Sequence, residues 1–352
     1  MPRNGKLVRI SLALVGAALV AALAVTGASA AQKSSKDTLS GSGSSLIAPA
    51  VAIWSQLYTA STIQYNSVGS GTGIKNISHR IGDFGASDAP LNKPQAQACN
   101  GCAQIPWALT ATSPVVNIPG VGPHQLKLTG TVLANIYLGK ITNWNDPAIT
   151  ALNKGLNLPN LKIVPVHRSD GSGDTYVFTN YLSKVSHVWK TQVGCATTVT
   201  WPGVGVGAPK NPGVAAAVSS NPGAIGYVSI AYTISNHLKL ARLKNRAGKY
   251  VLPTLGSIES AAQLVKSEKI PANNKISITD PPKSPKYRNA YPLSTFTYII
   301  IPLQSPKASA LKAFVTWALG SQAQGAIKKL VFAPMPSVVV KAAKKTLAKI
   351  HT

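Results

Sequence analysis

The chain has 352 residues, of which 35 are Lys or Arg and nine are Asp or Glu, so its formal charge is +26. Its hydrophobic content of 45% is enough for two globular domains, which excludes a chain that is disordered throughout. The basic residues are scattered and form no recognised nucleic-acid-binding motif, so the charge does not indicate a nucleic-acid partner. Carboxylates that pair in a native protein destabilise it when they become protonated, so the scarcity of acids predicts adaptation to an acidic exterior.

The first thirty residues have the order of a secretory signal peptide: cations, an apolar run, and the small-residue sequence ASA at 28–30. We expect cleavage after Ala30, which leaves +23 of the +26 charge because three cations precede the run. A retained membrane anchor is the alternative, although the run is short for a spanning helix. No cysteine follows the run, so a lipid anchor is not expected. Residues 31–38 are polar and are predicted to be a flexible leader.

Three Gly/Ser-rich turns each precede a predicted helix. The first, GSGSS at 41–45, leads into an amphipathic helix, and the second, GSGTG at 69–73, follows an alternating strand. The third, RSDGSGD at 168–174, follows the apolar strand 163–166. Strands that alternate with helices predict an α/β fold with mostly parallel sheets. Because binding sites in such sheets lie where strand ends meet helix starts, we expect the three turns to converge on one ligand.

The later elements continue this alternation. A loop at 221–223 enters a predicted buried strand, and the β-branched and aromatic residues of 294–303 predict another strand. Residues 305–331 are predicted to form one helix with an apolar face. The basic residues 341–352 are predicted to be a solvated terminal helix, with contact to an anionic surface as the alternative.

The third turn has the composition of an anion site. Unpaired N–H groups and the helix dipole favour an anion at a helix start, and glycine lets an oxyanion approach the backbone. An ordinary Ser/Asp helix cap is the alternative. Four of the nine acids fall in two short segments, Asp83 and Asp88 in DFGASDAP and Asp170 and Asp174 in RSDGSGD. A chain that dispenses with carboxylates elsewhere is expected to keep these for a function.

The three cysteines, Cys99, Cys102 and Cys195, allow one disulfide and leave one thiol. All three pairings are open from the sequence. A structural bridge is expected in an oxidising compartment. A redox role for the C-x-x-C is the alternative, which we disfavour because no strand and helix are predicted to frame it.

Enzymatic and metal-binding signatures are weak. The six histidines show no H-E-x-x-H spacing, and the cysteines offer too few ligands for zinc. No G-x-S-x-G motif is present, and GSGTGIKN lacks the G-K-[ST] ending of a P-loop. We therefore expect no metal, no cofactor and no catalysis.

Five segments in this order resemble one family: GSGSSLIAP, YNSVGSGTGIKNI, DFGASDAPL, RSDGSGDTYVFTNYLS and NPGAIGYV. They are similar to the phosphate-binding proteins of bacterial high-affinity phosphate ABC transporters, over residues 39–336. The resemblance implies a two-lobed type II periplasmic-binding-protein fold, with a ligand cleft between the lobes and a two-segment hinge. It also implies an extracytoplasmic monomer that captures inorganic phosphate and delivers it to the permease subunits of an ABC transporter.

The resemblance further implies the limits of the lobes. The first lobe takes residues 39–116 and 290–345, and the second takes residues 117–289. Residues 346–352 remain as a basic tail.

In the first lobe, the family's ligand contacts fall on Ser45, the N–H of Leu46, the hydroxyl of Ser70, and Asp88. Asp88 matches the carboxylate that accepts a proton from bound phosphate. Fully ionised sulfate has no proton to donate, so this role predicts that sulfate is rejected. The alternative is that Asp88 only caps the turn that follows it.

In the second lobe, the resemblance assigns the positive charge to Arg168, which Asp170 steadies, and further donors to Ser172 and the N–H of Gly173. Asp174 departs from the family, because many relatives carry Thr at this position. Its side chain is expected to cap the helix that it opens. The alternative is that it accepts a second ligand proton and favours dihydrogenphosphate.

Three other functions remain open. The same fold can bind another tetrahedral oxyanion or act as a secreted phosphate scavenger. A secreted phosphatase needs an activated nucleophile or a metal, which the sequence does not assemble. A cationic protein that adheres to the cell envelope needs neither Asp88 nor Arg168.

Overall fold

A computed structural model describes residues 36–203, 205–267 and 269–352. The predicted signal peptide at 1–30 and the leader as far as residue 35 lie outside the described residues. The predicted leader is one residue too long, because Thr38 already belongs to the first strand. Within the described ranges, no helix combines the length and the apolarity needed to cross a membrane.

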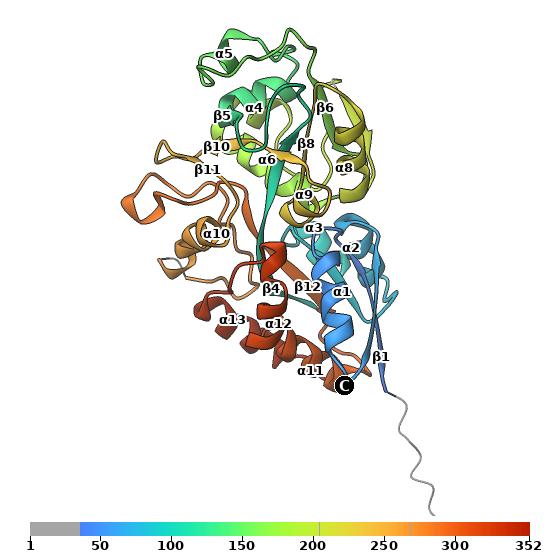
Figure 1. Cartoon of the computed structure of the whole chain (residues 1–352). Helices are drawn as coiled ribbons and strands as arrows, with labels where there is room; N and C mark the ends of the chain where they lie inside the picture. The colour runs from blue at the N-terminus through green and yellow to red at the C-terminus, as the bar shows by residue number, and fades with distance from the viewer. Residues whose placement is uncertain (1–35, 204, 268) are drawn as a thin grey trace, which may run out of the picture. The chain divides into compact units, whose positions relative to one another are not determined.

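The strands form one large sheet and one small sheet (Figure 1). The strands of the large sheet are β1 (Thr38–Gly43), β2 (Thr62–Ser67), β3 (Phe84–Ser87), β4 (Cys102–Val116), β6 (Val164–Arg168), β7 (Val206–Ala208), β8 (Ala224–Ser229), β9 (Lys239–Leu240) and β12 (Ser294–Pro302). Those of the small sheet are β5 (Lys127–Leu128), β10 (Arg242–Lys244) and β11 (Tyr250–Val251).

Helices follow most of the strands. The α-helices are α1 (Ala48–Leu57), α2 (Ser70–Ser78), α3 (Lys93–Ala98), α4 (Gly130–Tyr137), α5 (Pro147–Thr150), α6 (Gly173–Val185), α7 (His187–Gln192), α8 (Lys210–Ser220), α9 (Ile230–Ser235), α10 (Leu255–Ala262), α11 (Ala308–Ala318), α12 (Ser321–Ala326) and α13 (Ser337–Leu347). The 3-10 helices are η1 (Gln263–Lys266), η2 (Pro285–Tyr287) and η3 (Lys328–Leu330).

The large sheet has the order β2-β1-β3-β12-β4-β8-β6-β7, with β9 also paired to β4. Strand β4 joins its two halves, because it pairs with β12 as far as Ala111 and with β8 from Thr112 onward. In Figure 1, β4 accordingly runs between the half that carries α1 and α11 and the half that carries α4, α6 and α8. The predicted α/β fold is confirmed.

The prediction of mostly parallel sheets is wrong for the middle of the molecule. The outer strands β1, β2 and β3 are parallel, as are β6, β7 and β8. The central strands β12 and β4 run antiparallel to each other and to their neighbours β3 and β8. They are long and buried almost throughout, so their sequences show an apolar run that does not reveal strand direction.

Strand β1 was predicted as a turn, because its sequence TLSGSG is rich in Gly and Ser. The structure needs glycine there for space and, at Gly43 with its φ of 150°, for a backbone conformation that other residues rarely adopt. A Cβ on Gly41 would collide with the ring of Phe84, and one on Gly43 would collide with the backbone of Ala86. The small residues therefore let β1 lie close to β3, its neighbour in the sheet.

Each half of the sheet has its own hydrophobic core. On one side, Trp54 of α1 meets Trp107 of β4 edge to face, with ring centroids 5.3 Å apart. On the other side, Phe178 of α6 stacks on Tyr227 of β8 at 4.3 Å. Aromatic pairs of this kind contribute beyond the area that they bury, so they hold the helices firmly against the sheet.

The predicted helix at 305–331 is interrupted. Helix α11 ends at Ala318, and α12 begins at Ser321 after Gly320, whose backbone is extended. The buried residues Phe314 and Ala323 lie on either side of this break, so both helices still face the same core. Periodicity alone did not reveal the break, because the apolar spacing continues across it.

The C-terminal residues were predicted to be solvated, and this is wrong for one face of them. Val339, Ala343, Leu347 and Ile350 are buried at helical spacing, while the lysines between them are exposed. The backbone N–H of His351 also donates to a carbonyl of the segment after β12. Residues 346–352 are therefore packed rather than free.

The disulfide joins Cys99 to Cys102, and Cys195 is a free, exposed thiol. The bridge lies between α3 and β4, so the expectation that no helix and strand frame it is wrong. Asn100, which lies inside this ring, has a backbone carbonyl that accepts from Arg80 at 2.8 Å. A structural role for the bridge agrees with this anchoring.

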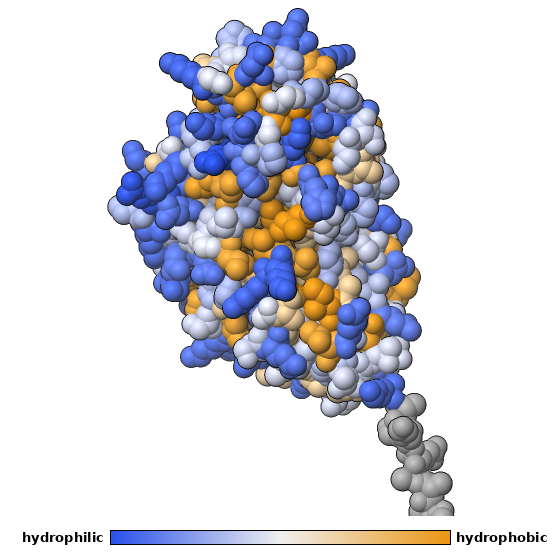
Figure 2. Space-filling model, in the orientation of Figure 1, coloured by the Kyte–Doolittle hydropathy of each residue, from blue (hydrophilic) through white to orange (hydrophobic). Residues whose placement is uncertain are grey.

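Figure 2 shows one face of the molecule coloured by hydropathy. Hydrophilic residues occur from one end of this face to the other, with apolar residues between them. The hydrophilic residues are spread out, as the scattered basic residues of the sequence led us to expect. Single exposed apolar residues such as Leu57 are normal on a protein surface.

Candidate functional site

The carboxyl ends of parallel strands from both halves of the sheet meet at one place. The turn after β2 contacts the turn after β6, because the N–H of Gly71 donates to the carbonyl of Gly171 at 2.9 Å. The N–H of Gly173 also donates to the hydroxyl of Ser70 at 3.0 Å. Ser45, in the turn after β1, accepts two hydrogen bonds from the start of α8. The three Gly/Ser turns therefore converge, as their sequences predicted.

The predicted ligand residues are all buried at this junction. Each of these residues is at most 4% exposed: Ser45, Leu46, Ser70, Asp88, Arg168, Ser172 and Asp174. Gly173 is buried as well, and a Cβ on it would collide with Asp88 of the other half. Glycine at this position lets the start of α6 approach the carboxylate closely.

Asp88 follows β3 directly and is fully buried. Its Oδ2 accepts from the hydroxyl of Ser44 at 2.5 Å and, more weakly, from that of Ser70 at 3.5 Å. Its Oδ1 has no hydrogen-bond partner among the described residues. A buried carboxylate oxygen without a donor costs free energy, so a donor from a ligand would stabilise it.

The protonation of Asp88 is unusual for a carboxyl group. Burial, and then the charge of Asp174, raise its pKa from the ordinary 3.8 to about 7. The hydrogen bond from Ser44 and the nearby hydroxyl of Thr297 oppose this shift, as does the charge of Arg168. Near neutral pH, Asp88 can therefore either hold a proton or accept one.

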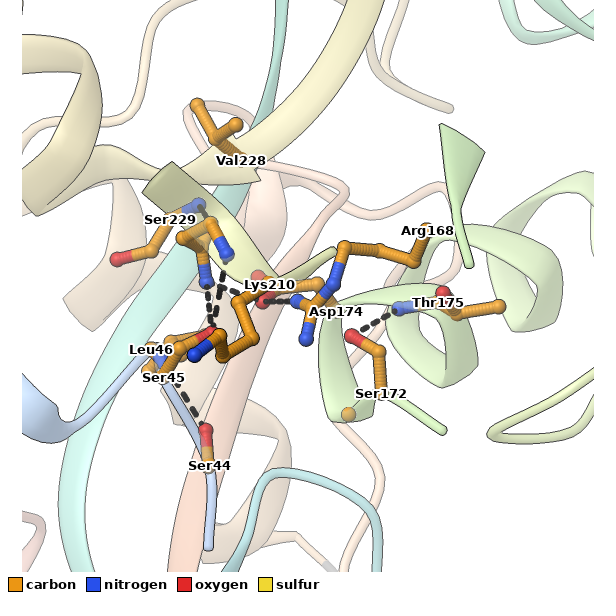
Figure 3. A network of polar contacts seen from close by, with 12 residues as sticks. Ser44, Ser45, Leu46, Arg168, Ser172, Asp174, Thr175, Lys210, Val228 and Ser229 are labelled. Carbon is orange, nitrogen blue, oxygen red and sulfur yellow. Dashed lines mark hydrogen bonds and ion pairs between the residues drawn. The ribbon is translucent and has the colours of Figure 1, made fainter. Parts of the chain in front are cut away.

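Arg168 is the last residue of β6 and is almost completely buried. Its Nε and Nη2 donate to Asp170 at 2.7 and 2.5 Å, and its Nη1 donates to Asp174 at 3.1 Å. Burial opposes the ionised form of Asp170, but the hydrogen bonds and charge of Arg168 outweigh it and lower the Asp170 pKa. The guanidinium is thus held in a fixed direction by two carboxylates. Figure 3 shows Arg168 beside one of them, Asp174.

Asp174 does not cap helix α6 as predicted. The cap is Ser172, whose hydroxyl accepts from the N–H of Thr175 at 3.3 Å. Asp174 is instead the second residue of the helix, and its Oδ2 accepts from Arg168. Figure 3 shows these side chains together at the start of α6. The Asp174 carboxylate could either cap the helix or pair with Arg168. It pairs with Arg168, because a hydrogen bond to a buried cation is stronger than one to a backbone N–H.

The other predicted donors have partners within the protein. The N–H of Leu46 donates to the hydroxyl of Ser44 at 3.0 Å, and that of Gly173 donates to Ser70. A ligand at this junction would take over these N–H groups, which already point at oxygen atoms.

Sequence reasoning missed three polar residues of the site. Ser44 binds Asp88, and Thr112 of β4 donates to Asp174 Oδ1 at 2.6 Å. Asn211, at the start of α8, donates to Asp174 Oδ2 at 2.7 Å and to Ser45 at 3.0 Å. Ser44 lies inside a motif that the sequence had singled out. Nothing local distinguishes the other two, because they reach the site only when β4 and α8 are placed around it.

No three His, Cys, Asp or Glu side chains of the described residues gather as metal ligands. The chemistry that the site offers is therefore that of one guanidinium, backbone N–H groups, hydroxyls and one carboxyl group that can exchange a proton. These groups suit the non-covalent binding of an oxyanion.

Comparisons with known proteins agree with this arrangement. A model of the PBP superfamily domain matches residues 28–322. Phosphate-binding protein PstS of Xylella fastidiosa is 41% identical over 317 residues, which cover 88% of this chain and 85% of that protein. PstS of Pasteurella multocida is 40% identical over 324 residues, which cover 90% of this chain and 92% of that protein.

Solved structures share the fold. A high-affinity periplasmic phosphate-binding protein, PfluDING, solved with bound phosphate, has a TM-score of 0.69 at 20% identity and covers 88% of this chain and 93% of its own. A phosphate-binding protein from Stenotrophomonas maltophilia has a TM-score of 0.66 at 19% identity, with coverage of 88% and 93%. These are periplasmic binding proteins of the two-lobed fold. The chain therefore belongs to the PBP superfamily and, within it, to the family of phosphate-binding proteins called PstS.

Proposed function

We propose that the protein captures inorganic phosphate outside the cytoplasm and delivers it to the permease of an ABC transporter. The observation that carries the proposal is the fully buried Asp88, whose Oδ1 has no donor among the described residues and lies at the junction with Arg168. The PstS relatives are named for phosphate binding, and the likeness extends over nearly the whole chain after the signal peptide.

The proposed ligand contacts are those that the family resemblance implied. Backbone N–H groups of Leu46 and Gly173 and the hydroxyls of Ser45, Ser70 and Ser172 would replace the water around the anion. Arg168 would supply the positive charge, directed by Asp170. Since these groups come from both halves of the sheet, a ligand between them would favour the closed arrangement of the lobes.

Asp88 would give the site its selectivity. Hydrogenphosphate can donate its proton to the carboxylate, whereas sulfate brings only acceptors and leaves two of them facing each other. Binding would involve no covalent step, and we infer that the protein is not an enzyme. A secreted phosphatase would need an activated nucleophile at this site. The hydroxyls of Ser45, Ser70 and Ser172 accept from N–H groups, and the proposal gives Asp88, the acceptor of Ser44, to the ligand.

We also propose that the lobes comprise residues 39–116 with 290–345, and residues 117–289. The change of partner within β4 supports a crossing near Thr112, whose N–H donates to the carbonyl of Leu293 on the returning segment. Helix α10 lies beside β4 and β12, so this part of the second lobe is in contact with both crossing segments.

Calorimetric titration of the secreted protein with phosphate, sulfate and arsenate tests the proposal. We expect phosphate to bind at least about 10³-fold more tightly than sulfate, because the site is built around a ligand proton. Asp88→Asn should reduce this ratio by about tenfold or more, since an amide can donate to sulfate. Turnover of a chromogenic phosphate ester, or equal affinity for phosphate and sulfate, would overturn it.

A further inference from the structure

Asp174 is held as a fixed carboxylate rather than as a free ligand contact. Three donors from three different elements satisfy its two oxygens: Thr112 of β4 at 2.6 Å, Asn211 of α8 at 2.7 Å and Arg168 of β6 at 3.1 Å. The amide of Asn211 is itself fixed, because its Oδ1 accepts from the N–H of Ser229 at 2.7 Å. The Asp174 side chain is 1% exposed, so solvent does not compete with these donors.

These donors also determine the charge of Asp174. Burial raises the pKa of its carboxyl group above the ordinary value, although the charge of Arg168 and the hydrogen bonds from Thr112 and Asn211 oppose this shift. The guanidinium of Arg168 and the amide nitrogen of Asn211 can only donate hydrogen bonds, so Oδ2 of Asp174 must accept both. The ion pair with Arg168 and the amide donor of Asn211 on the same oxygen are what hold Asp174 in its charged form.

The carboxylates outnumber the cations at the site. Arg168 faces Asp170 and Asp174, and the negative charge of Asp174 acts on Asp88. Lys210, which begins α8, is half-buried, and its backbone N–H donates to Asp170 at 2.8 Å. Even if the Lys210 charge is counted, two cations meet three carboxyl groups.

His167 precedes Arg168, and burial lowers the pKa of its imidazole, so it brings no further positive charge near neutral pH. The other titratable groups that we place at the site, among the described residues, are three tyrosines. They are Tyr65 of β2, Tyr227 of β8 and Tyr232 of α9, and burial raises the pKa of each above its ordinary value. They stay neutral in the physiological range, so they do not compensate the excess of carboxylates.

A doubly charged anion at this junction therefore enters a region that is already neutral or negative, and within a buried site each further like charge is costly. From this arrangement we propose that Asp174 makes the site selective for the singly charged form of a tetrahedral oxyanion, dihydrogenphosphate, acting as a fixed charge on Arg168. The proposal rests on the proposed function. It makes Asp174 a specificity-determining residue that acts through Arg168 and Asp88.

The proton balance gives the proposal a measurable consequence. Above neutral pH, phosphate in solution is mostly hydrogenphosphate, so binding must take up one proton from solvent to place dihydrogenphosphate in the site. Linkage then requires the apparent affinity to fall about tenfold per pH unit on the alkaline side. If hydrogenphosphate were the bound form, the affinity there would be nearly constant.

The experiment is calorimetry with inorganic phosphate between about pH 7.5 and 9, in two buffers of different ionisation enthalpy, which counts the protons taken up. We expect about one proton per phosphate for the wild-type protein. Asp174→Asn keeps the shape of the side chain without its charge, so its affinity should become nearly independent of pH and its proton uptake should approach zero. Asp146→Asn, at the cap of α5, removes a carboxylate outside the site and should leave both quantities unchanged.

The outcomes separate the two proposals. Tight binding of phosphate with no proton uptake by the wild-type protein overturns the inference and leaves the proposed function standing. Absence of phosphate binding at any pH overturns the proposed function itself. Asp174→Thr provides a second variant whose folding is checked by thermal unfolding. If neither variant folds, the pH dependence of phosphate affinity above neutral pH in the wild-type protein tests the inference.

Discussion

Asp88 is removed from water completely, and the groups that hydrogen bond to it are hydroxyls. Its pKa in the folded protein, about 7, lies above the ordinary 3.8 because burial disfavours the charged form. Between these two values the folded protein binds a proton that the unfolded chain has released. The free energy of unfolding contributed by Asp88 is therefore greatest in acid and is lost as the pH rises through 7.

This sign predicts the effect of Asp88→Asn on stability. At about pH 8 the variant should be more stable than the wild-type protein by roughly 1–3 kcal/mol, because it does not bury a charge. At about pH 5 the gain should be clearly smaller, because folded Asp88 is then protonated and only the proton released by the unfolded chain opposes folding. Denaturant unfolding in phosphate-free buffer at both pH values measures this. Asp146→Asn serves as the control, and a gain of equal size at both pH values would contradict the explanation.

The turns before α2 and α6 bring two backbones into contact across the site. A Cβ on Gly71 would lie 3.0 Å from the Cα of Gly171, which is closer than side chains normally allow. The hydrogen bond between these residues is also made by backbone atoms alone. The two backbones can therefore approach this closely only because Gly71 and Gly171 have no side chains.

Gly71→Ala should therefore oppose closure of the lobes. We expect phosphate affinity to fall by about tenfold or more, because the variant must reach a closed state that is less populated. Calorimetry gives the affinity, and X-ray scattering with and without phosphate reports whether the protein still becomes compact. Gly325→Ala is the matched control, since Gly325 is exposed in α12 with nothing near its Cβ position. That substitution should raise stability by about 0.5–1 kcal/mol and leave affinity unchanged.

Few carboxylates contribute to the pH dependence of the whole molecule. Asp170 has a lowered pKa, so its contribution to stability is present near neutral pH and is lost in acid. Burial raises the pKa of Asp88 and of Asp280, and their contributions have the opposite sign. The contributions of these carboxyl groups therefore oppose one another, so the net driving force for acid unfolding should be small; adaptation to an acidic exterior stays a prediction.

We expect the thermal unfolding midpoint to change by only a few degrees between about pH 5 and pH 3, the range in which ordinary carboxylates titrate. Differential scanning calorimetry at low ionic strength and at high ionic strength separates carboxylate titration from general charge repulsion. A steep fall of the midpoint over this range, insensitive to salt, would count against the explanation.

Much of the site was readable from the sequence because its motifs are local. The turns that carry Ser45, Ser70 and Ser172 have small residues beside helix starts, and the rarity of acids drew attention to Asp88 and Asp174. Local composition determines whether a turn can offer N–H groups to an anion. The same reasoning predicted the α/β class, since helices and strands alternate with clear periodicity.

The contacts around these residues could not be predicted from local sequence. Asp174 was expected to cap its own helix, but Arg168 and Asn211 hold it instead. Strand β1 looked like a turn, and the antiparallel direction of β12 and β4 left no mark on their apolar sequences. The sequence by itself determined which groups the site contains and the class of fold. Their partners, charges and strand directions depend on contacts between segments far apart in the chain, and only packing brings those segments together.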